Sequence, residues 1–239
     1  MSEQRWLVPP SGLPILEVQR LGRRPYGEVH ELQKRLLEQR IAGAIPDQLL
    51  LVEHEPVVTI GRGAERAAVA AVAHQVFEIE RGGEATWHGP GQLVAYPILE
   101  LDEPRRDLHR YLRDLEEVVI RMLAELDIEG RREPGKTGVW VGERKIASIG
   151  VAVRSWVTWH GFALNLTCSA KDFADFQPCG LDPRAMTCVA EQTQQPFTFL
   201  LFEVLAVKHV CEVFGRDLPP VRVPIPEPPR FPDLPILPG

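Results

Sequence analysis

Short apolar runs of strand length constrain the fold of this chain more than any other feature of its sequence. They recur along most of its 239 residues, at 14–20, 48–53, 57–60, 76–80, 92–99, 138–142, 145–153 and 157–166. Runs of this length and composition favour strands. Because helical segments interrupt the series at only a few places, the sequence predicts an α+β domain with a mixed, largely antiparallel sheet packed against helices.

Helical periodicity marks three further segments. The clearest covers residues 107–126, where Asp107 is placed to cap the N-terminus. Residues 26–42 have an amphipathic pattern, and residues 197–213 have the composition of a buried helix. The apolar stripe of the first segment consists of Leu108, Leu112, Leu115, Val119, Met122 and Leu126.

The two ends of the chain differ from its middle. Residues 1–13 are predicted to form an irregular arm, and prolines crowd the chain from Pro219 to Pro238. We therefore expect a single domain over residues 1–215 and an extended, polyproline-like tail over residues 216–239.

Charge and hydropathy narrow the class of protein. The chain has 27 basic and 33 acidic residues, a net charge of −6, which argues against a nucleic-acid partner. No signal-peptide pattern begins the chain, and no apolar run approaches the roughly 18 residues of a membrane helix. We expect a cytoplasmic protein without a membrane partner. Local basic clusters are typical of solvated surface; they lie at Arg105, Arg106, Arg110 and Arg113 and at Arg131, Arg132 and Lys136.

Of four cysteines, Cys179 has the neighbours of a presented thiol. Pro178 fixes the chain direction before it, and Gly180 leaves space beside its sulfur. A catalytic nucleophile and a buried inert thiol are both open interpretations. Cys168 and Cys211 lie in apolar surroundings typical of inert thiols, and Cys188 is undecided. No CxxC pair occurs, so a zinc site has little support.

Glycines dominate residues 81–91, within the string RGGEATWHGPGQLVAYP. Gly82 and Gly83 allow another molecule to approach the main chain. We predict a loop that lines a substrate channel, with Arg81 and His88 at its edge; a long structural turn is the alternative.

Two polar residues interrupt other apolar strands. Lys145 lies near the start of the strand-like run RKIASIG, where desolvation would disfavour its charged form and allow proton exchange near neutral pH. A lysine that simply reaches solvent is the alternative. His160 lies in WHGFALN, where a core histidine with satisfied hydrogen bonds is the alternative to a functional one.

Residues 130–137 read GRREPGKT and match the phosphate-loop pattern as a string. A phosphate loop needs a buried strand before it and a helix after it. Here a helical segment precedes the string and a strand-like run follows it, so we reject this interpretation.

Together, these segments resemble one family, the lipoyl(octanoyl) transferases. The matching strings are RGGEATWHGPGQLVAYP, GKTGVWVGERKIASIGV, WHGFALNL and FQPCGL, which occur in the family's order over roughly residues 59–181. The resemblance implies a fold related to biotin and lipoate protein ligases, with a mixed sheet and helices around an acyl-binding tunnel.

The resemblance also implies an activity and its residues. It makes Cys179 and Lys145 the catalytic pair. Implied substrate-binding residues are Arg81, Gly82, Gly83, Glu84, Ala85, Thr86, Trp87, His88, Ser148, Ile149, Gly150, Gly161, Phe162 and Ala163. The implied reaction is octanoyl transfer from octanoyl-acyl carrier protein to a lysine of lipoyl domains, in 2-oxoacid dehydrogenase E2 subunits and in the glycine-cleavage H protein. Neither ATP nor a metal is expected, because the donor is a phosphopantetheine thioester.

A cysteine paired with a lysine suits this chemistry. An ammonium stabilises the thiolate that attacks a thioester, and the lysine then moves the protons. Candidate donors to the oxyanion are backbone N–H groups beside Gly82–Gly83 or at Gly180. Acidic carrier and acceptor proteins would favour the arginine clusters as docking rims. Alternatives are an ATP-dependent lipoate or biotin protein ligase, a non-catalytic acyl-binding protein and a thioester hydrolase.

Overall fold

The computed structural model describes residues 4–6, 12–63, 72, 74–173, 182–219 and 222–224. Its main element is a six-stranded sheet in the order β2-β3-β7-β10-β9-β8. The strands are β2 (Leu16–Arg24), β3 (Asp47–His54), β7 (Gln92–Ile98), β10 (Val157–Asn165), β9 (Arg144–Arg154) and β8 (Val139–Val141). β2 and β3 are parallel because helix α1 (Tyr26–Ile41) crosses over between them, and the other neighbours are antiparallel.

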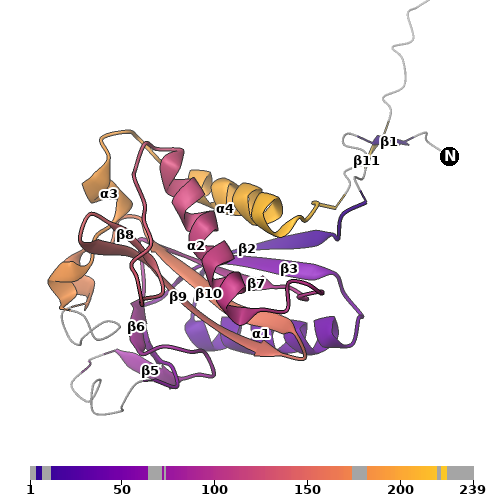
Figure 1. The fold of residues 1–239 in the computed structure, drawn as a ribbon, viewed down its shortest axis with the longest axis horizontal. Coiled ribbons are helices and arrows are strands. Elements are labelled where there is room, and N and C mark those ends of the chain that lie inside the picture. Colours follow the sequence, from indigo (N-terminus) through magenta and orange to yellow (C-terminus); the bar gives the residue numbers. More distant parts are fainter. Residues whose placement is uncertain are drawn as a thin grey trace, which may run out of the picture.

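Helices cover both faces of this sheet (Figure 1). α2 (Leu108–Ala124) and α4 (Phe199–Phe214) lie on one face, and α1 lies on the other. β3 shows how the sequence divides between the two layers. Leu49 and Leu51 pack in the core under α2 and α4, whereas Leu50 and Val52 pack under α1. This period of two is the strand geometry that the apolar run predicts.

A smaller sheet lies beside the main one. It has the order β5-β4-β6, from β5 (Gln75–Glu78), β4 (Val57–Ile60) and β6 (Ala85–His88). β4 is parallel to β5 and antiparallel to β6. The sequence predicts β4 and β5 but misses β6, because the glycines on both sides of residues 85–88 give the whole segment the composition of a loop. Shorter helices follow β10, namely η2 (Ala170–Phe173), η4 (Pro183–Ala185) and α3 (Val189–Gln192).

The predicted cap at the start of α2 is confirmed. The Asp107 carboxylate caps α2, where it accepts from the backbone N of His109 at 2.8 Å and of Arg110 at 3.1 Å. α4 begins at a Thr198 cap and ends at Gly215, whose φ of 62° lies in the left-handed region that glycine adopts without strain. These caps fix the lengths of the two helices that cover one face of the sheet.

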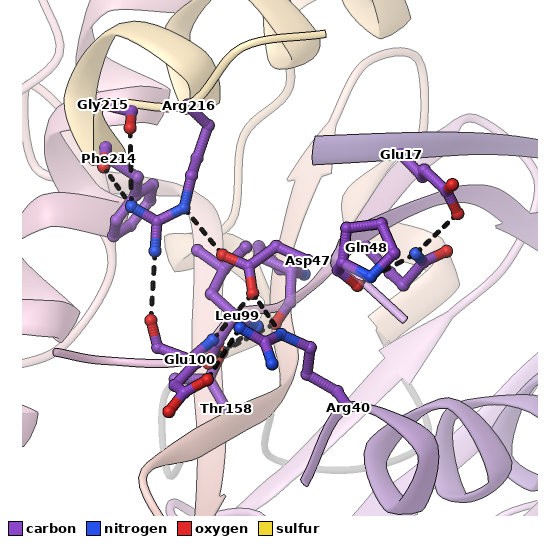
Figure 2. A network of polar contacts seen from close by, with 12 residues as sticks. Glu17, Arg40, Asp47, Gln48, Leu99, Glu100, Thr158, Phe214, Gly215 and Arg216 are labelled. Atoms are coloured by element: carbon purple, nitrogen blue, oxygen red, sulfur yellow. Dashed lines mark hydrogen bonds and ion pairs between the residues drawn. The ribbon is translucent and has the colours of Figure 1, made fainter. Parts of the chain in front are cut away.

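A buried carboxylate joins the layers at one end of the sheet (Figure 2). Asp47 accepts from Arg40 Nε and from Arg216 Nε, each at 2.7 Å, and from the backbone N of Glu100 at 3.0 Å. Arg40 belongs to α1, whereas Arg216 directly follows Gly215 at the end of α4. This network therefore ties the helices on opposite faces to the start of β3.

The predicted ends need correction. Gln4–Trp6 and Arg222–Pro224 are strands β1 and β11, paired antiparallel with each other. The irregular arm and the polyproline-like tail are therefore wrong at these residues, since a polyproline helix makes no backbone hydrogen bonds. Residues 225–239 lie outside the described part of the chain. Among the helices that the structure describes, none has both the length and the apolar character needed to cross a bilayer.

Candidate functional site

A cavity of about 370 Å³ lies where the small sheet meets β7, β9 and β10. Most of the predicted binding residues line it: Arg81, Gly83, Glu84, Thr86, His88, Ser148, Ile149, Gly150, Gly161, Phe162 and Ala163. Lys145 lines it as well. Segments near residues 85, 145 and 162 thus meet around one hollow, and their roles in binding stay predictions.

Three predicted binding residues lie elsewhere. Gly82 donates its backbone N to Val151 O at 3.0 Å, so this amide is already used and is not a free oxyanion donor. Ala85 and Trp87 point away from the cavity into a separate apolar cluster. The alternation along β6 accounts for the split, because Thr86 and His88 face the cavity while Ala85 and Trp87 face the cluster.

Arg81 is a buried cation with fixed geometry. One guanidinium nitrogen donates to Thr59 O and Oγ1 at 3.0 Å each, and the other donates to Gly82 O at 3.0 Å. Gly150 of β9 allows the side chain to lie flat against the sheet. An added Cβ at Gly150 would stand 2.8 Å from Arg81 Cδ, closer than two carbons can pack. Arg81 therefore gives the cavity wall a permanent positive charge.

Lys145 is only 4% exposed. Its Nζ lies 5.2 Å from the centre of the Trp140 ring. Gly138 makes room for the side chain, since an added Cβ there would lie 2.7 Å from Lys145 Cε. The alternative of a solvent-reaching lysine is therefore wrong. Among the described residues, no carboxylate lies within ion-pair distance of this ammonium.

Cys179 lies outside the described residues, but the chain on both sides of its segment is placed. Phe173 packs against Trp87 with ring centres 5.3 Å apart. After the segment, Met186 forms a parallel bridge with Lys145, and Thr187 N donates to Lys145 O at 2.9 Å. The chain that follows Cys179 therefore returns to the strand of Lys145.

The described cysteines are the thiols that the sequence treats as inert or undecided. Burial raises the pKa of Cys168, of Cys188 and of Cys211, the last to about 11. A raised pKa keeps a thiol protonated and weakly nucleophilic at neutral pH. None of these described thiols is activated by its surroundings.

Histidines near the cavity are held neutral. Burial lowers the pKa of His88 to about 3 and of His54 to about 4. His88 Nδ1 pairs with Gln92 Oε1 at 2.7 Å, and His54 Nε2 pairs with the Tyr96 hydroxyl at 2.8 Å. His160 differs, because its Nε2 is buried and has no hydrogen-bond partner among the described residues. The expectation of a fully satisfied core histidine is wrong for this atom.

The string GRREPGKT has the context that the sequence predicts. It follows α2, and strand β8 comes after it where a phosphate loop needs a helix. Gly135, Lys136 and Thr137 instead line the cavity. The sequence predicts Lys136 as part of a basic surface cluster and predicts no role for Gly135 or Thr137, whereas the fold brings all three to the site.

The arginine clusters are largely engaged within the protein. Arg105 donates to Phe214 O at 2.6 Å, and Arg106 donates to Leu101 O at 3.1 Å. Arg113 and Arg132 both pair with the buried Glu116, at 2.6 and 3.2 Å. Glu116 also accepts from Gly138 N at 3.1 Å, so the cluster supports the backbone beside Lys145. Through these contacts the four arginines stabilise the fold.

Comparison with known proteins identifies the family to which this chain belongs. The family model for the lipoyl protein ligase A/B catalytic domain matches residues 25–210. The chain belongs to this family. The match includes every described residue that lines the cavity and both members of the predicted catalytic pair.

Individual relatives of this family agree. The chain is 43% identical over 208 residues to a protein named Octanoyltransferase from Syntrophotalea carbinolica. The aligned region covers 87% of this chain and 99% of that protein. It is 46% identical over 210 residues to a protein of the same name from Rubrobacter xylanophilus, with coverage of 84% and 94%. A solved structure described as a putative lipoate protein ligase from T. acidophilum matches with a TM-score of 0.67 at 15% identity, covering 86% of this chain and 87% of that one. This last likeness confirms the predicted fold.

Proposed function

We propose that this protein transfers an octanoyl group from octanoyl-acyl carrier protein to a specific lysine of lipoyl domains. The proposed acceptors are the lipoyl domains of 2-oxoacid dehydrogenase E2 subunits and the glycine-cleavage H protein, in the cytoplasm. The names of the relatives support an octanoyl transfer. This would be the first step of protein lipoylation from an endogenous acyl group.

The buried ammonium of Lys145 is the observation that carries the proposal. It stands in a cavity wall, and no described carboxylate pairs with it. A buried charge without a partner is costly, so the site favours an anion beside Lys145. We propose that the thiolate of Cys179 is this anion. The hydrogen bond from Thr187 to Lys145 supports the pairing, because it brings the chain eight residues after Cys179 to the same strand.

The first half-reaction would load the enzyme. Transfer of the Cys179 thiol proton to the Lys145 amine forms the ammonium–thiolate pair, and the thiolate attacks the carbonyl carbon of the donor thioester. The bond to the carrier sulfur breaks, and Lys145 returns the proton to that sulfur. The products are the free carrier thiol and an octanoyl thioester on Cys179.

The second half-reaction would deliver the acyl group. The ε-amine of the acceptor lysine attacks the thioester carbon and gives up a proton, which Lys145 accepts and passes to the departing Cys179 sulfur. An amide forms as the thioester breaks, and the enzyme returns to its starting state. Thioester to amide is downhill, so the scheme needs no ATP.

Pocket size and lining support a medium acyl chain. Phe162, Ala163, Val94 and Ile149 give the cavity an apolar side. A volume of about 370 Å³ is within the usual range for small-ligand sites. Arg81 lies on the polar side and is a candidate to interact with the thioester oxygen.

A reconstituted transfer assay tests this function. Octanoyl-carrier protein and an unmodified lipoyl domain are mixed with the enzyme without ATP, and octanoylation of the domain is followed by mass spectrometry. We expect turnover by the wild type, and losses of about 100-fold or more in Cys179→Ser and Lys145→Ala. Cys211→Ser is the matched control, since that thiol lies on α4 away from the cavity.

Each alternative function has its own outcome in this assay. An ATP-dependent ligase would use free octanoate with ATP and would tolerate Cys179→Ser. A hydrolase would release free octanoate when no acceptor is present. A non-catalytic acyl-binding protein would bind the donor and leave the lipoyl domain unmodified. Any of these three results would contradict the proposal.

A further inference from the structure

Two histidines and a glutamate from distant parts of the chain converge behind the cavity. They are His30 on α1, Glu80 just after β5, and His160 on β10. One ligand atom from each residue lies within 4.8 Å of the other two. His30 Nε2 and Glu80 Oε2 are 3.2 Å apart. We propose that this cluster binds a transition-metal ion of the Zn²⁺ type.

The distances are close to those of a tetrahedral site. Zinc bonds of about 2.0–2.1 Å place neighbouring ligand atoms about 3.4 Å apart. The His30–Glu80 separation of 3.2 Å already has this length. The longest separation in the trio, at most 4.8 Å, must close by no more than about 1.4 Å, which side-chain rotation can supply.

An unsatisfied atom independently points to a ligand at this place. His160 is 2% exposed, and its Nε2 has no hydrogen-bond partner among the described residues. Gln33, also fully buried, accepts from His160 N at 3.0 Å, while its own Nε2 has no partner in the part of the chain that the structure describes. Buried polar atoms without partners are costly, and a bound ion with its water would satisfy such atoms.

The donor set selects the kind of metal. Two imidazoles with one carboxylate suit zinc and related ions, whereas Mg²⁺ and Ca²⁺ prefer sets made of oxygen alone. Burial lowers the pKa of both His30 and His160, so both rings are in the neutral form that a metal requires. Three protein ligands leave one coordination position for water.

Two cations lie near the cluster, so binding of a metal ion would depend on the negative charge of Glu80. Arg81 and Lys34 lie near the two histidines and disfavour a cation. Lys34 is partly neutralised by Glu31, at 2.9 Å. Of the described acids near His30, Glu80 is the one that Lys34 does not neutralise; its side chain is 42% exposed and lines a surface hollow with Trp159. This hollow offers the ion a path from solvent.

The ion would have a structural role, and it would affect the cavity by holding a side chain of the cavity wall in place. His160 lines the acyl cavity, but His30 does not. A bound metal would therefore fix the ring of His160 and join α1 to β10 behind the cavity. The cysteine spacing of the sequence gives no hint of this site, because its ligands are histidine and glutamate and only the fold brings them together.

Calorimetric titration with ZnCl₂ tests the proposal directly. It uses the full chain without a polyhistidine tag, stripped with a chelator and desalted. We expect one site in the wild type and a loss of affinity of about ten-fold or more in Glu80→Gln and in His30→Gln. At a free zinc concentration about 100 times Kd, Tm should rise by about 5–10 °C. MgCl₂ should produce neither effect.

Glu125→Gln is the matched control. Glu125 also pairs with a buried histidine, since its Oε1 lies 3.1 Å from His209 Nε2. The second acid at His209 is Glu212, which contacts the opposite ring nitrogen, Nδ1, so the two carboxylates do not face one common position. This variant should keep wild-type zinc affinity. The proposal is overturned if zinc does not bind, or if binding is unchanged in Glu80→Gln while that variant has the wild-type Tm without metal. It is also overturned by a crystal structure soaked in zinc that places only water at His160 Nε2.

Discussion

Replacing Gly138 by alanine should displace Lys145 and remove the transfer activity. The new Cβ would lie 2.6 Å from Ala147 O and 2.7 Å from Lys145 Cε. Ala147 O belongs to the backbone of β9 and cannot yield, so the lysine side chain must move. Overpacking of this kind costs about 1–3 kcal/mol. The φ of 138° at Gly138 adds backbone strain of about 1–3 kcal/mol for a residue with a side chain.

Gly142→Ala is the control that separates strain from collision. Gly142, in the turn between β8 and β9, also has a positive φ, of 56°, but an added Cβ there meets no atom of the described residues within 4 Å. We expect the control to lose about 1–2 kcal/mol of unfolding free energy and to keep transfer activity. Gly138→Ala should lose about 2–6 kcal/mol, a fall in Tm of about 4–24 °C, and at least about 100-fold in transfer. Equal stability and equal activity of the two variants would refute the proposed packing around Lys145.

Three other predictions follow from buried polar groups. Asp47→Asn removes the charge shared by two arginines, so it should cost about 3–5 kcal/mol in urea denaturation; a cost below about 1 kcal/mol would contradict the network. Since burial holds the pKa of His54 near 4, below its value in the unfolded chain, the free energy of unfolding should fall as pH drops from about 6.5 toward 4. His54→Gln should reduce that slope by about 1.4 kcal/mol per pH unit, and an unchanged slope would refute the assignment. Arg81→Lys loses the forked hydrogen bonds to Thr59 and should lower Tm together with transfer; a wild-type transfer rate would show that the fork is dispensable.

Local features were predictable from the sequence. The stripe of residues 107–126 and its Asp107 cap give α2 because both signals lie within the helix itself. β3, β4 and β7 follow from apolar runs that are buried on both faces. β6 was missed because its four residues stand between glycines, and its partner β4 lies far back in the chain.

Contacts between segments far apart in the chain could not be predicted from local sequence patterns, and only the family resemblance indicated some of them. Lys145 and Arg81 come to one cavity because β9 packs beside the small sheet, and no local pattern encodes that packing. The Asp47–Arg216 contact joins the start of β3 to the end of the last helix. The family resemblance implied most of the residues that line the cavity. It also implied Ala85 and Trp87, whose side chains point into a separate apolar cluster because side chains alternate along β6.

Intact-mass spectrometry of the enzyme mixed with octanoyl-carrier protein, in the absence of any acceptor, tests the proposed covalent intermediate most directly. We expect one octanoyl group per chain, mapped to Cys179, labile to hydroxylamine and formed far more slowly in Lys145→Ala. An enzyme that stays unmodified while it still octanoylates a lipoyl domain, or an adduct on another residue, would contradict it.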